Sequence, residues 1–455
     1  MIDLNQLVSS QRAFFLSQKT KSYDFRMEQL KKLSAWMDQN EEAILKSLRE
    51  DLGKSAYEGY LTEIAMVRQE LKDAMRHLKR WMKPKAVPAA IGQLPGRCRI
   101  LPEPYGVALI MSPWNYPFQL TAAPLIGAIS AGCCAVVKPS AYSASTSSLI
   151  RRMAEELFDP CYIAVVEGGR QENAGLLEQH FDKIFFTGSP AVGRLVMEKA
   201  AAHLTPVSLE LGGKSPVIVD ETADIALAAR RIAWGKCVNA GQTCVAPDYV
   251  LVHHSRETEL VEKLIQELRR MYTSAPLANP DWPKIINQRH FERLIGLIGS
   301  GAVSYGAQLD LQKRKISPTI LTDVEWDSPV MQEEIFGPIL PILTYRTLEE
   351  AIGRIRSLPR PLALYLFTRS AETQRRVLTE VRFGGGCVND TILHLATPHM
   401  PFGGVGESGM GGYHGKYSFD AFSHEKSILK RFSRPDVPLR YAPYDGKMKW
   451  LKKWM

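Results

Sequence analysis

The chain has 455 residues, more than one hydrophobic core usually supports, so we expect two or three domains. Hydrophobic residues make up 45% and charged residues 23% of the chain, which excludes disordered, collagen-like and disulfide-rich classes. The net charge of +9 is spread among acidic residues, without a zinc finger, an RNP-like motif or a basic–aromatic stripe. We therefore expect no nucleic-acid partner and a surface that attracts small anions.

The cysteines and the apolar runs indicate where such a chain works. None of the seven cysteines forms a CxxC pair, which favours free thiols in a reducing compartment and no metal site. The N-terminal residues lack the basic and apolar regions of a signal peptide. No apolar run reaches the roughly 18 residues that span a bilayer. We expect a cytoplasmic protein.

The first 82 residues have apolar side chains at helical spacing. Leu30, Leu33, Trp36 and Met37 share one stripe of a helical stretch that ends at Gly53. Prolines recur between residues 84 and 102 and predict an extended connector.

From Tyr105 onward, short apolar runs alternate with helix-compatible segments, which is typical of an open parallel sheet covered on both faces. A second α/β block begins near Glu210, and a glycine-rich segment follows residue 399. We expect a nucleotide-binding domain over residues 1–209, with a bridging connector at about 85–103. A catalytic domain over 210–398 and a C-terminal bridging return over 399–455 complete the division.

The last residues, KMKWLKKWM, mix lysines with large apolar side chains. A basic amphipathic segment of this kind can rest on an acidic membrane surface, but this one is too short to bind strongly by itself. We therefore favour docking of the tail on its own protein over membrane contact.

Cys244 is the first candidate for chemistry. Most cysteines are inert buried side chains, and Cys133 and Cys134 in an apolar strand fit that interpretation. Cys244 instead follows a polar turn, Gly-Gln-Thr, after a helix. An accessible thiol beside backbone donors is what a nucleophilic thiolate needs.

Glu210 and Asn115 are the second and third candidates. Glu210 stands between two leucines, either as a surface position or as a desolvated carboxyl that acts as a general base. The following glycine pair favours the desolvated alternative, because it allows close approach to the backbone. Asn115 is either an ordinary turn residue or a donor to a developing oxyanion.

The dinucleotide fingerprint GxGxxG is absent after the early strands. The segment from Gly188 to Gly193 opens a helix after an apolar strand, and its N-terminus favours a phosphate or nicotinamide-side contact. Lys138, at the end of another strand, is a candidate anion contact. Each signal is weak by itself.

Seven motifs in a fixed order resemble the aldehyde dehydrogenase superfamily, and most closely its class 3 branch of fatty and aromatic aldehyde oxidisers. The motifs are SPWNYP, VVKPS, FTGS, LELGGKSP, GQTC, EEIFGP and PFGGVGESGMG, and they cover residues 104–420. The resemblance implies an α/β fold with two Rossmann-like open-sheet domains and a small oligomerisation element.

The resemblance assigns the chemistry. Cys244 matches the nucleophile that forms a thiohemiacetal and then an acyl thioester. The side chain of Asn115 and the backbone N–H of Cys244 match the oxyanion donors. Glu210 matches the residue that activates water for hydrolysis.

The resemblance also implies NAD or NADP as cofactor, bound without the usual glycine fingerprint. Lys138 matches a contact to the adenosine ribose, and Glu334 and Phe336 match the pair at the nicotinamide ribose and ring. The remaining cofactor-binding positions are Ser112, Trp114, Thr187, Gly188, Ser189, Val192, Gly193, Leu211 and Gly212.

One position departs from the pattern. Many relatives have a glutamate three residues after the lysine, but this chain has Ala141. Without that carboxylate, a 2′-phosphate meets less repulsion while Lys138 remains to attract it. We therefore expect NADP to be accepted, alongside NAD.

Apolar residues near the motifs suggest a hydrophobic substrate funnel suited to medium- or long-chain aliphatic or aromatic aldehydes. We expect Tyr116, Leu120, Phe402 and His414 to line it, with residues 392–396 nearby; the alternative is that these side chains only pack the core. By resemblance, a homodimer with a strand-mediated interface is expected.

Three other functions remain as alternatives. An acylating relative would pass the acyl group to coenzyme A instead of water. Such an enzyme needs no carboxylate that activates water, so the presence of Glu210 argues against it. A cysteine hydrolase would need a histidine base, for which His414 is the best candidate. A non-catalytic descendant would be expected to have lost Cys244, Glu210 or Asn115, and all three are present.

Overall fold

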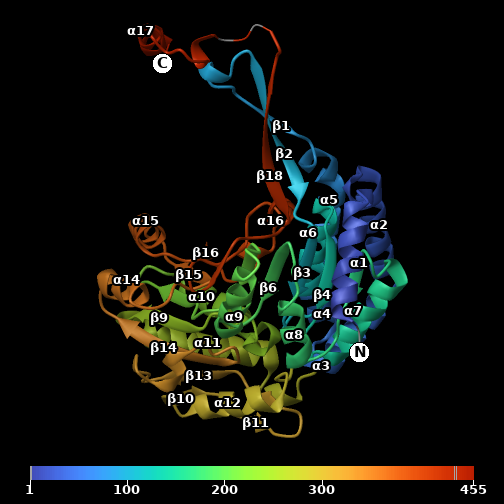
Figure 1. Cartoon of the computed structure of the whole chain (residues 1–455). Coiled ribbons are helices and arrows are strands. Elements are labelled where there is room, and N and C mark those ends of the chain that lie inside the picture. Colours follow the sequence, from blue (N-terminus) through green and yellow to red (C-terminus); the bar gives the residue numbers. More distant parts are fainter. Residues whose placement is uncertain (1–2, 435, 437, 455) are drawn as a thin grey trace.

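The computed structural model describes residues 3–434, 436 and 438–454 (Figure 1). Helices form the N-terminal 82 residues, as expected. The predicted apolar stripe is buried, but the stretch is two helices that meet at Asn40, and the second ends at Gly53 with a left-handed φ of 71°. The elements of this part are α1(Leu4–Leu16), η1(Lys19–Lys21), α2(Tyr23–Gln39), α3(Glu41–Leu52), α4(Ala56–Gly59), a π-helical turn η2(Tyr60–Ile64) and α5(Ala65–Trp81).

The first sheet has the strand order β17-β7-β6-β3-β4-β5. Its five longer strands are parallel, and only β17 runs antiparallel, against β7. The strands are β3(Val107–Met111), β4(Cys134–Lys138), β5(Ile163–Val165), β6(Lys183–Thr187), β7(Val207–Glu210) and β17(Gly409–Met410). The crossover helices are α6(Gln119–Ala131), α7(Ala144–Leu157), α8(Arg170–Leu177) and α9(Pro190–Ala201).

The second sheet has the order β10-β13-β14-β9-β8-β15-β16, and all its strands except β10 are parallel. Its strands are β8(Pro216–Val219), β9(Tyr249–His253), β10(Ala302–Tyr305), β13(Thr319–Thr322), β14(Ile339–Tyr345), β15(Ala363–Phe367) and β16(Gly385–Val388). Its helices are α10(Ile225–Cys237), α11(Glu257–Tyr272), α12(Gln288–Ile298), α13(Pro329–Gln332), α14(Leu348–Arg356) and α15(Ala371–Glu380). A small ribbon, β11(Leu309–Asp310) with β12(Lys315–Ile316), lies outside this sheet.

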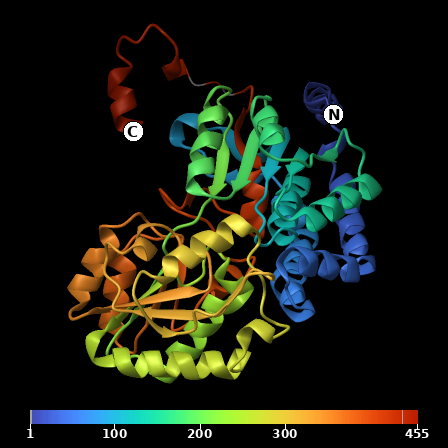
Figure 2. The same cartoon turned by 90° about the horizontal axis from the view of Figure 1, so that it is seen from below.

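Short 3₁₀ turns connect these elements. They are η3(Ile91–Gln93), η4(Val238–Gly241), η5(His254–Arg256), η6(Pro276–Ala278), η7(Leu393–Leu395) and η8(Pro438–Arg440). The two sheet units lie side by side in Figure 2. Glu210 is the last residue of β7 in the first sheet, and the second sheet begins only at Pro216. The fold is therefore α/β with two Rossmann-like open sheets, as expected.

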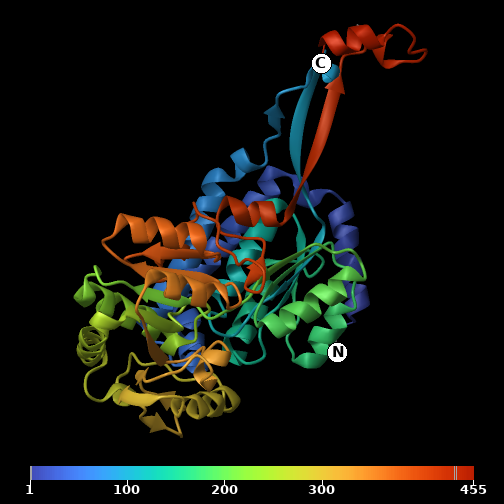
Figure 3. The same ribbon diagram turned by 90° about the vertical axis from the view of Figure 1, so that its left-hand side faces the viewer.

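A third sheet, with strand order β1-β2-β18, projects from the body as an arm (Figure 3). It contains β1(Lys85–Val87), β2(Gly96–Pro104) and β18(Ser423–Arg431), and α16(Lys416–Ala421) leads into it. The long antiparallel pairing of β18 with β2 joins the expected connector to the C-terminal return.

The C-terminal helix α17(Met448–Trp454) lies beyond the arm, away from both sheet units (Figures 1 and 3). Met448, Trp450 and Leu451 are exposed. The ammonium of Lys447 donates to the carbonyl oxygens of Pro438 and Tyr441, which belong to the same tail. The expected docking of the tail on its own protein is therefore wrong for the described part of the chain, because its hydrogen bonds close on itself. None of the described helices is long and apolar enough to cross a membrane.

Candidate active site

Neighbouring strands of the first sheet bring most of the predicted cofactor residues to one edge. The carboxyl ends of parallel strands meet at the same edge of a sheet, where open α/β sheets bind ligands. The residues at or just after these ends are Ser112 and Trp114 after β3, Lys138 in β4, Thr187, Gly188 and Ser189 at β6, and Glu210, Leu211 and Gly212 at β7.

Cys244 lies in the turn between α10 and β9, where the second sheet faces this edge. The turn η4 precedes it, and Asn239 and Ala240 there have left-handed φ values of 52° and 50°. The thiol lines a cavity of about 150 Å³. Cys244 is only partly exposed. A ligand therefore reaches its thiol through this cavity.

Burial raises the pKa of the Cys244 thiol to about 12, and the carboxyls of Glu334 and Glu210 add to the rise. This environment therefore favours the protonated thiol over the thiolate. Desolvation disfavours the thiolate, and both nearby groups carry negative charge when ionised. Attack by this sulfur requires a base.

Glu210 is buried, with a side chain 2% exposed, which decides between the two alternatives left open by the sequence. Desolvation raises the pKa of its carboxyl well above 4.5. Neither carboxyl oxygen has a hydrogen-bond partner among the described residues. A carboxyl in this state binds a proton more tightly than a solvated one and is suited to general-base catalysis near neutral pH.

Asn115 lies within hydrogen-bonding distance of the Cys244 turn. Its Nδ2 donates to the carbonyl oxygen of Gln242 at 3.1 Å. A side-chain amide has two N–H groups, so one remains for another acceptor beside the thiol. The side chain of Tyr116, the next residue, meets Thr243 on the same turn, with 2.6 Å between the two hydroxyl oxygens.

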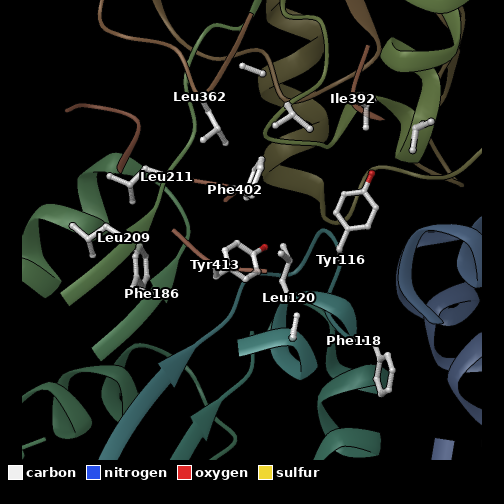
Figure 4. Close-up of a cluster of buried hydrophobic side chains, with 14 of the residues drawn as sticks. Tyr116, Phe118, Leu120, Phe186, Leu209, Leu211, Leu362, Ile392, Phe402 and Tyr413 are labelled. Carbon is white, nitrogen blue, oxygen red and sulfur yellow. The ribbon is translucent and has the colours of Figure 1, made fainter. Parts of the chain in front are cut away.

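The predicted funnel residues come together around Cys244. Figure 4 shows Tyr116, Leu120, Phe402 and Tyr413 around one space, with Ile392 beside it. The cavity lining contains all four predicted residues, Tyr116, Leu120, Phe402 and His414, together with Ile392, Leu393, Leu395 and Ala396 from the predicted stretch. Most of the lining is apolar, so the cavity fits a hydrophobic ligand.

Several lining residues were missed by sequence reasoning. They come from the helical turn around residues 60–66, the start of α6, α10 with the turn η4 after it, and the glycine-rich return. They are Leu61, Thr62, Met66, Gln119, Trp234, Val238 and Tyr413. Helical periodicity would assign an apolar residue such as Trp234 to the core. Only the approach of α10 to the N-terminal helices turns it toward a cavity.

The comparisons with known proteins match this geometry. The model of the aldehyde dehydrogenase family matches residues 3–428. The chain is 49% identical to the 4,4'-diaponeurosporen-aldehyde dehydrogenase of Staphylococcus aureus (strain NCTC 8325 / PS 47), covering 99% of this chain and 98% of that protein. It is 46% identical to aldehyde dehydrogenase family 3 member H1 of Arabidopsis thaliana, covering 99% and 94%.

The chain belongs to the aldehyde dehydrogenase family. The solved substrate-bound state of Staphylococcus aureus AldH superposes with a TM-score of 0.98 at 48% identity and covers 100% of both chains. An indole-3-acetaldehyde dehydrogenase in complex with NAD+ superposes with a TM-score of 0.86 at 26% identity, covering 94% and 89%. This aldehyde dehydrogenase therefore oxidises aldehydes to acids with NAD or NADP as cofactor.

Three observations fit a dinucleotide at the sheet edge of this dehydrogenase. The hydroxyl of Thr187 is buried without a hydrogen-bond partner among the described residues, at the end of β6. Ser189 caps α9 by accepting from Val192 N at 3.5 Å, so the helix N-terminus faces the edge with its backbone donors. A Cβ at Gly193 would lie 2.6 Å from Leu211, so this glycine lets α9 approach β7 closely.

The other predicted cofactor residues of the dehydrogenase lie between the two sheets. Phe336, with φ of 52°, meets Trp114 edge-to-face at 5.3 Å between ring centroids. Glu334 approaches Gly212 so closely that a Cβ there would lie 2.1 Å from Oε2. Desolvation and the charge of Asp248 raise the pKa of Glu334 to about 8, so this carboxyl can exchange a proton near neutral pH.

Lys138 is more enclosed than the sequence suggested. Its ammonium donates to the carbonyl oxygens of Pro139 at 2.8 Å and Gly168 at 2.7 Å. Burial lowers the pKa of the amine. The lysine is thus held at the end of β4 by two backbone bonds. The hydroxyl of Ser112 is similarly engaged, with its oxygen 2.6 Å from that of Thr121.

Proposed function

We propose that this aldehyde dehydrogenase oxidises medium- or long-chain aliphatic or aromatic aldehydes through a covalent intermediate on Cys244. The observation that carries the proposal is the apolar cavity that holds the thiol, with the Asn115 amide beside its turn and the Glu210 carboxyl in electrostatic range. An apolar cavity with few polar groups at its inner end binds an aldehyde by its hydrocarbon part and orients the carbonyl.

The first step is attack of the Cys244 sulfur on the aldehyde carbon. Because the thiol is protonated in this environment, its proton passes to a base as the S–C bond forms, and Glu210 is the unpartnered carboxyl nearest to hand. The carbonyl oxygen becomes an oxyanion and accepts hydrogen bonds from Asn115 Nδ2 and the backbone N–H of Cys244. The product is a thiohemiacetal.

A nicotinamide ring held at the sheet edge would supply the hydride acceptor, so that the thiohemiacetal carbon could lose its hydride as the oxyanion collapses. Collapse of the oxyanion then leaves an acyl thioester on Cys244. Glu210 first releases to solvent the proton that it took from the thiol. It then takes a proton from water as the water oxygen attacks the thioester carbon, and it passes this proton to the thiolate that leaves. The carboxylic acid is released and the cysteine is restored.

The cofactor preference follows from two residues at the end of β4. Lys138 supplies a positive charge, and Ala141 supplies no carboxylate to repel a 2′-phosphate. We propose that both NAD and NADP are used. A kcat/KM with NADP hundreds of times below that with NAD would contradict this.

A second copy of the chain is the proposed partner, as the resemblance to the class 3 branch implies. The arm carries exposed apolar side chains on β18, Ile428 and Leu429, which a monomer would leave in water. We propose a homodimer formed through this arm.

We also propose a cytoplasmic location, because all seven cysteines are free. The sequence offered membrane contact of the tail as the alternative to docking on the protein. Co-sedimentation of the dimer with anionic vesicles would support this contact, and failure to co-sediment would exclude it.

Steady-state kinetics with a panel of aldehydes, each with NAD and with NADP, tests the proposal. The panel includes 4,4'-diaponeurosporen-aldehyde, which the Staphylococcus aureus relative is named for. We expect kcat/KM to rise with the length of the hydrocarbon part. A preference for short, polar aldehydes would contradict the assignment of the cavity.

Two variants separate the steps. Cys244→Ser is expected to abolish oxidation, whereas Glu210→Gln is expected to slow formation of the acyl enzyme and then to stall at its hydrolysis. Consumption of coenzyme A during oxidation would instead indicate an acylating enzyme. Full activity of Cys244→Ser would rule out the covalent route.

A further inference from the structure

A buried ion pair in the N-terminal helices lies directly behind the proposed oxyanion donor. The Lys54 ammonium donates to Glu63 Oε1 at 2.6 Å, and neither side chain is exposed to solvent. The π-helical turn η2 carries Glu63 and places it opposite Lys54, which follows the end of α3. The chemistry described above uses neither residue.

Both members of the pair extend their hydrogen bonds into the loop that carries Asn115. Lys54 Nζ donates to the carbonyl oxygen of Asn115 at 3.1 Å and lies 3.9 Å from the centroid of the Tyr116 ring. Glu63 Oε2 accepts from the backbone N–H groups of Phe118 at 2.9 Å and Gln119 at 3.2 Å. The backbone on both sides of Tyr116 is therefore anchored to one ion pair.

The same carbonyl oxygen connects the pair to the Cys244 turn. Asn239 Nδ2 donates to Asn115 O at 2.8 Å and to Gln242 O at 3.1 Å. The backbone N–H of Asn239 donates to Glu58 Oε1 at 2.8 Å, so the helical segment also holds this strained residue. The Asn115 amide points at Gln242 O, and its direction depends on the backbone that Lys54 and Asn239 fix.

We infer that Lys54, paired with Glu63, is a positioning residue that fixes the Asn115 amide against the Cys244 turn. The inference rests on the proposed role of Asn115 as an oxyanion donor. A donor held within a few tenths of an ångström stabilises a developing oxyanion better than one that must be ordered during the reaction. A buried ion pair often adds little to stability over an apolar pair of similar size, so stability by itself does not account for one at this place.

Loss of the Lys54 ammonium alone changes both the stability of the chain and the position of Asn115. A double variant separates these two effects. Lys54→Met leaves the Glu63 carboxylate buried without its cation, which lowers stability. Lys54→Met with Glu63→Gln restores a neutral pair, because the amide oxygen still accepts from the loop. We expect the double variant to regain most of the lost Tm. Its kcat for aldehyde oxidation is expected to stay about tenfold or more below that of the unmodified chain, with the KM for NAD within about twofold.

Lys183→Met is the matched control. Lys183 is also buried, and burial lowers the pKa of its amine to about 8, but it lies at the amino end of β6, opposite to the edge that holds the cofactor residues. Its removal is expected to leave kcat within about twofold. A loss of kcat in this control equal to that of the Lys54 variants would show that any buried lysine has the effect, and it would overturn the inference.

Coupling to Asn115 is the deciding measurement, made by single-turnover oxidation of one aldehyde with NAD. If Lys54 acts through Asn115, Lys54→Met lowers the rate of the Asn115→Ala variant by less than about twofold. Equal loss in both backgrounds, or recovery of kcat together with Tm in the double variant, overturns the inference. If Lys54→Met does not fold, Glu63→Gln is used in its place. This variant keeps Lys54 but removes its anionic partner, and its effect on the rate is compared in the unmodified chain and in the Asn115→Ala variant. Full activity of Asn115→Ala would instead refute the proposed role of Asn115.

Discussion

At the residue scale, the reaction centre is defined by desolvation. Glu210 ends a buried strand and has no hydrogen-bond partner among the described residues, and Cys244 shares its surroundings with two carboxyls. Both groups therefore favour their protonated forms. The Glu210 carboxylate binds a proton tightly, and the Cys244 thiol has a raised pKa. Transfer of the thiol proton to Glu210 can therefore accompany formation of the S–C bond.

Replacement of Glu210 by glutamine is expected to stabilise the folded chain at alkaline pH. The folded-state pKa of Glu210 lies well above 4.5, so its contribution to stability is full below the unfolded pKa and is lost as the pH rises through the folded pKa. Gln does not ionise, so the gain in the free energy of unfolding should be larger at about pH 8 than at about pH 5. Urea unfolding at the two pH values measures the difference. Equal gains at both values would contradict a buried, uncharged Glu210.

The pH dependence of catalysis should follow the same groups. Both Cys244 and Glu210 have raised pKa values, so the active, deprotonated forms increase as the pH rises. We expect kcat/KM to increase from pH 6 toward about pH 9, by about tenfold per unit where one proton controls the rate. The rise should weaken in Glu210→Gln during the acylation burst. A rate that falls over this range would exclude a base in the rate-limiting step.

Ala141 should control use of NADP. Ala141→Glu introduces a carboxylate three residues after Lys138, where it would repel a 2′-phosphate. We expect kcat/KM with NADP to fall about tenfold or more, while that with NAD stays within about threefold. Ala141→Gln, which has the same shape without the charge, is the control. An equal loss with both cofactors would indicate displacement of the loop instead of charge.

At the scale of elements, loops after the sheet edges do the positioning. Lys54 and Glu63 reach the Asn115 loop from the N-terminal helices, and the glycine-rich return supplies Phe402 and Tyr413 to the cavity. Gly403 in that return lies so close to Glu210 that a Cβ would be 3.2 Å from Oε1. A Cβ at Gly403 would also lie 2.3 Å from the carbonyl oxygen of Gly411, so glycine is needed here chiefly because the return passes close to its own backbone.

Gly212→Ala should damage cofactor binding without unfolding the chain. A Cβ at residue 212 would overlap the carboxylate of Glu334, which is the end of a flexible side chain and can move. We expect the KM for NAD to rise about fivefold or more and the Tm to change little. Gly296→Ala in α12, where a Cβ meets nothing within 4 Å, is the matched control and should leave KM unchanged. An unchanged KM in Gly212→Ala would argue against a cofactor role for Glu334.

At the scale of the whole molecule, the arm is the part that a single copy leaves uncovered. The three strands β1, β2 and β18 project from the body, and α17 lies beyond them with exposed apolar side chains (Figure 3). Exposed apolar side chains gathered on one projecting element are typical of an interface.

Ile428→Asp should weaken the proposed dimer. Ile428 is 41% exposed on β18, so a carboxylate there should change the stability of the monomer little. Burial of the same carboxylate in the interface should weaken association of the two copies strongly. Light scattering is expected to give twice 51.0 kDa for the unmodified chain and a lower mass at micromolar concentration for the variant. Leu378→Asp on α15, at similar exposure away from the arm, is the control. A monomer for the unmodified chain would refute the arm as an interface.

Sequence reasoning recovered the fold and the family, and the nucleophile that it proposed, Cys244, lines the apolar cavity. Helical spacing and short apolar runs predicted the N-terminal helices and two parallel sheets, since both patterns are local. Motif order indicated the family. The division of the helical stretch at Asn40 and the missed Trp234 show the limit, because a helical pattern does not reveal which partner each face meets.

The order of residues by itself determined which groups exist and where each stands relative to a strand end: Cys244 in a turn, Glu210 at the end of β7 and Asn115 after β3. Only the tertiary structure decided their state. Burial of Glu210, the protonated thiol and the hold of Lys54 on Asn115 depend on segments distant in sequence that exclude water together. Desolvation and charge are properties of a three-dimensional neighbourhood, and no spacing along the chain encodes them.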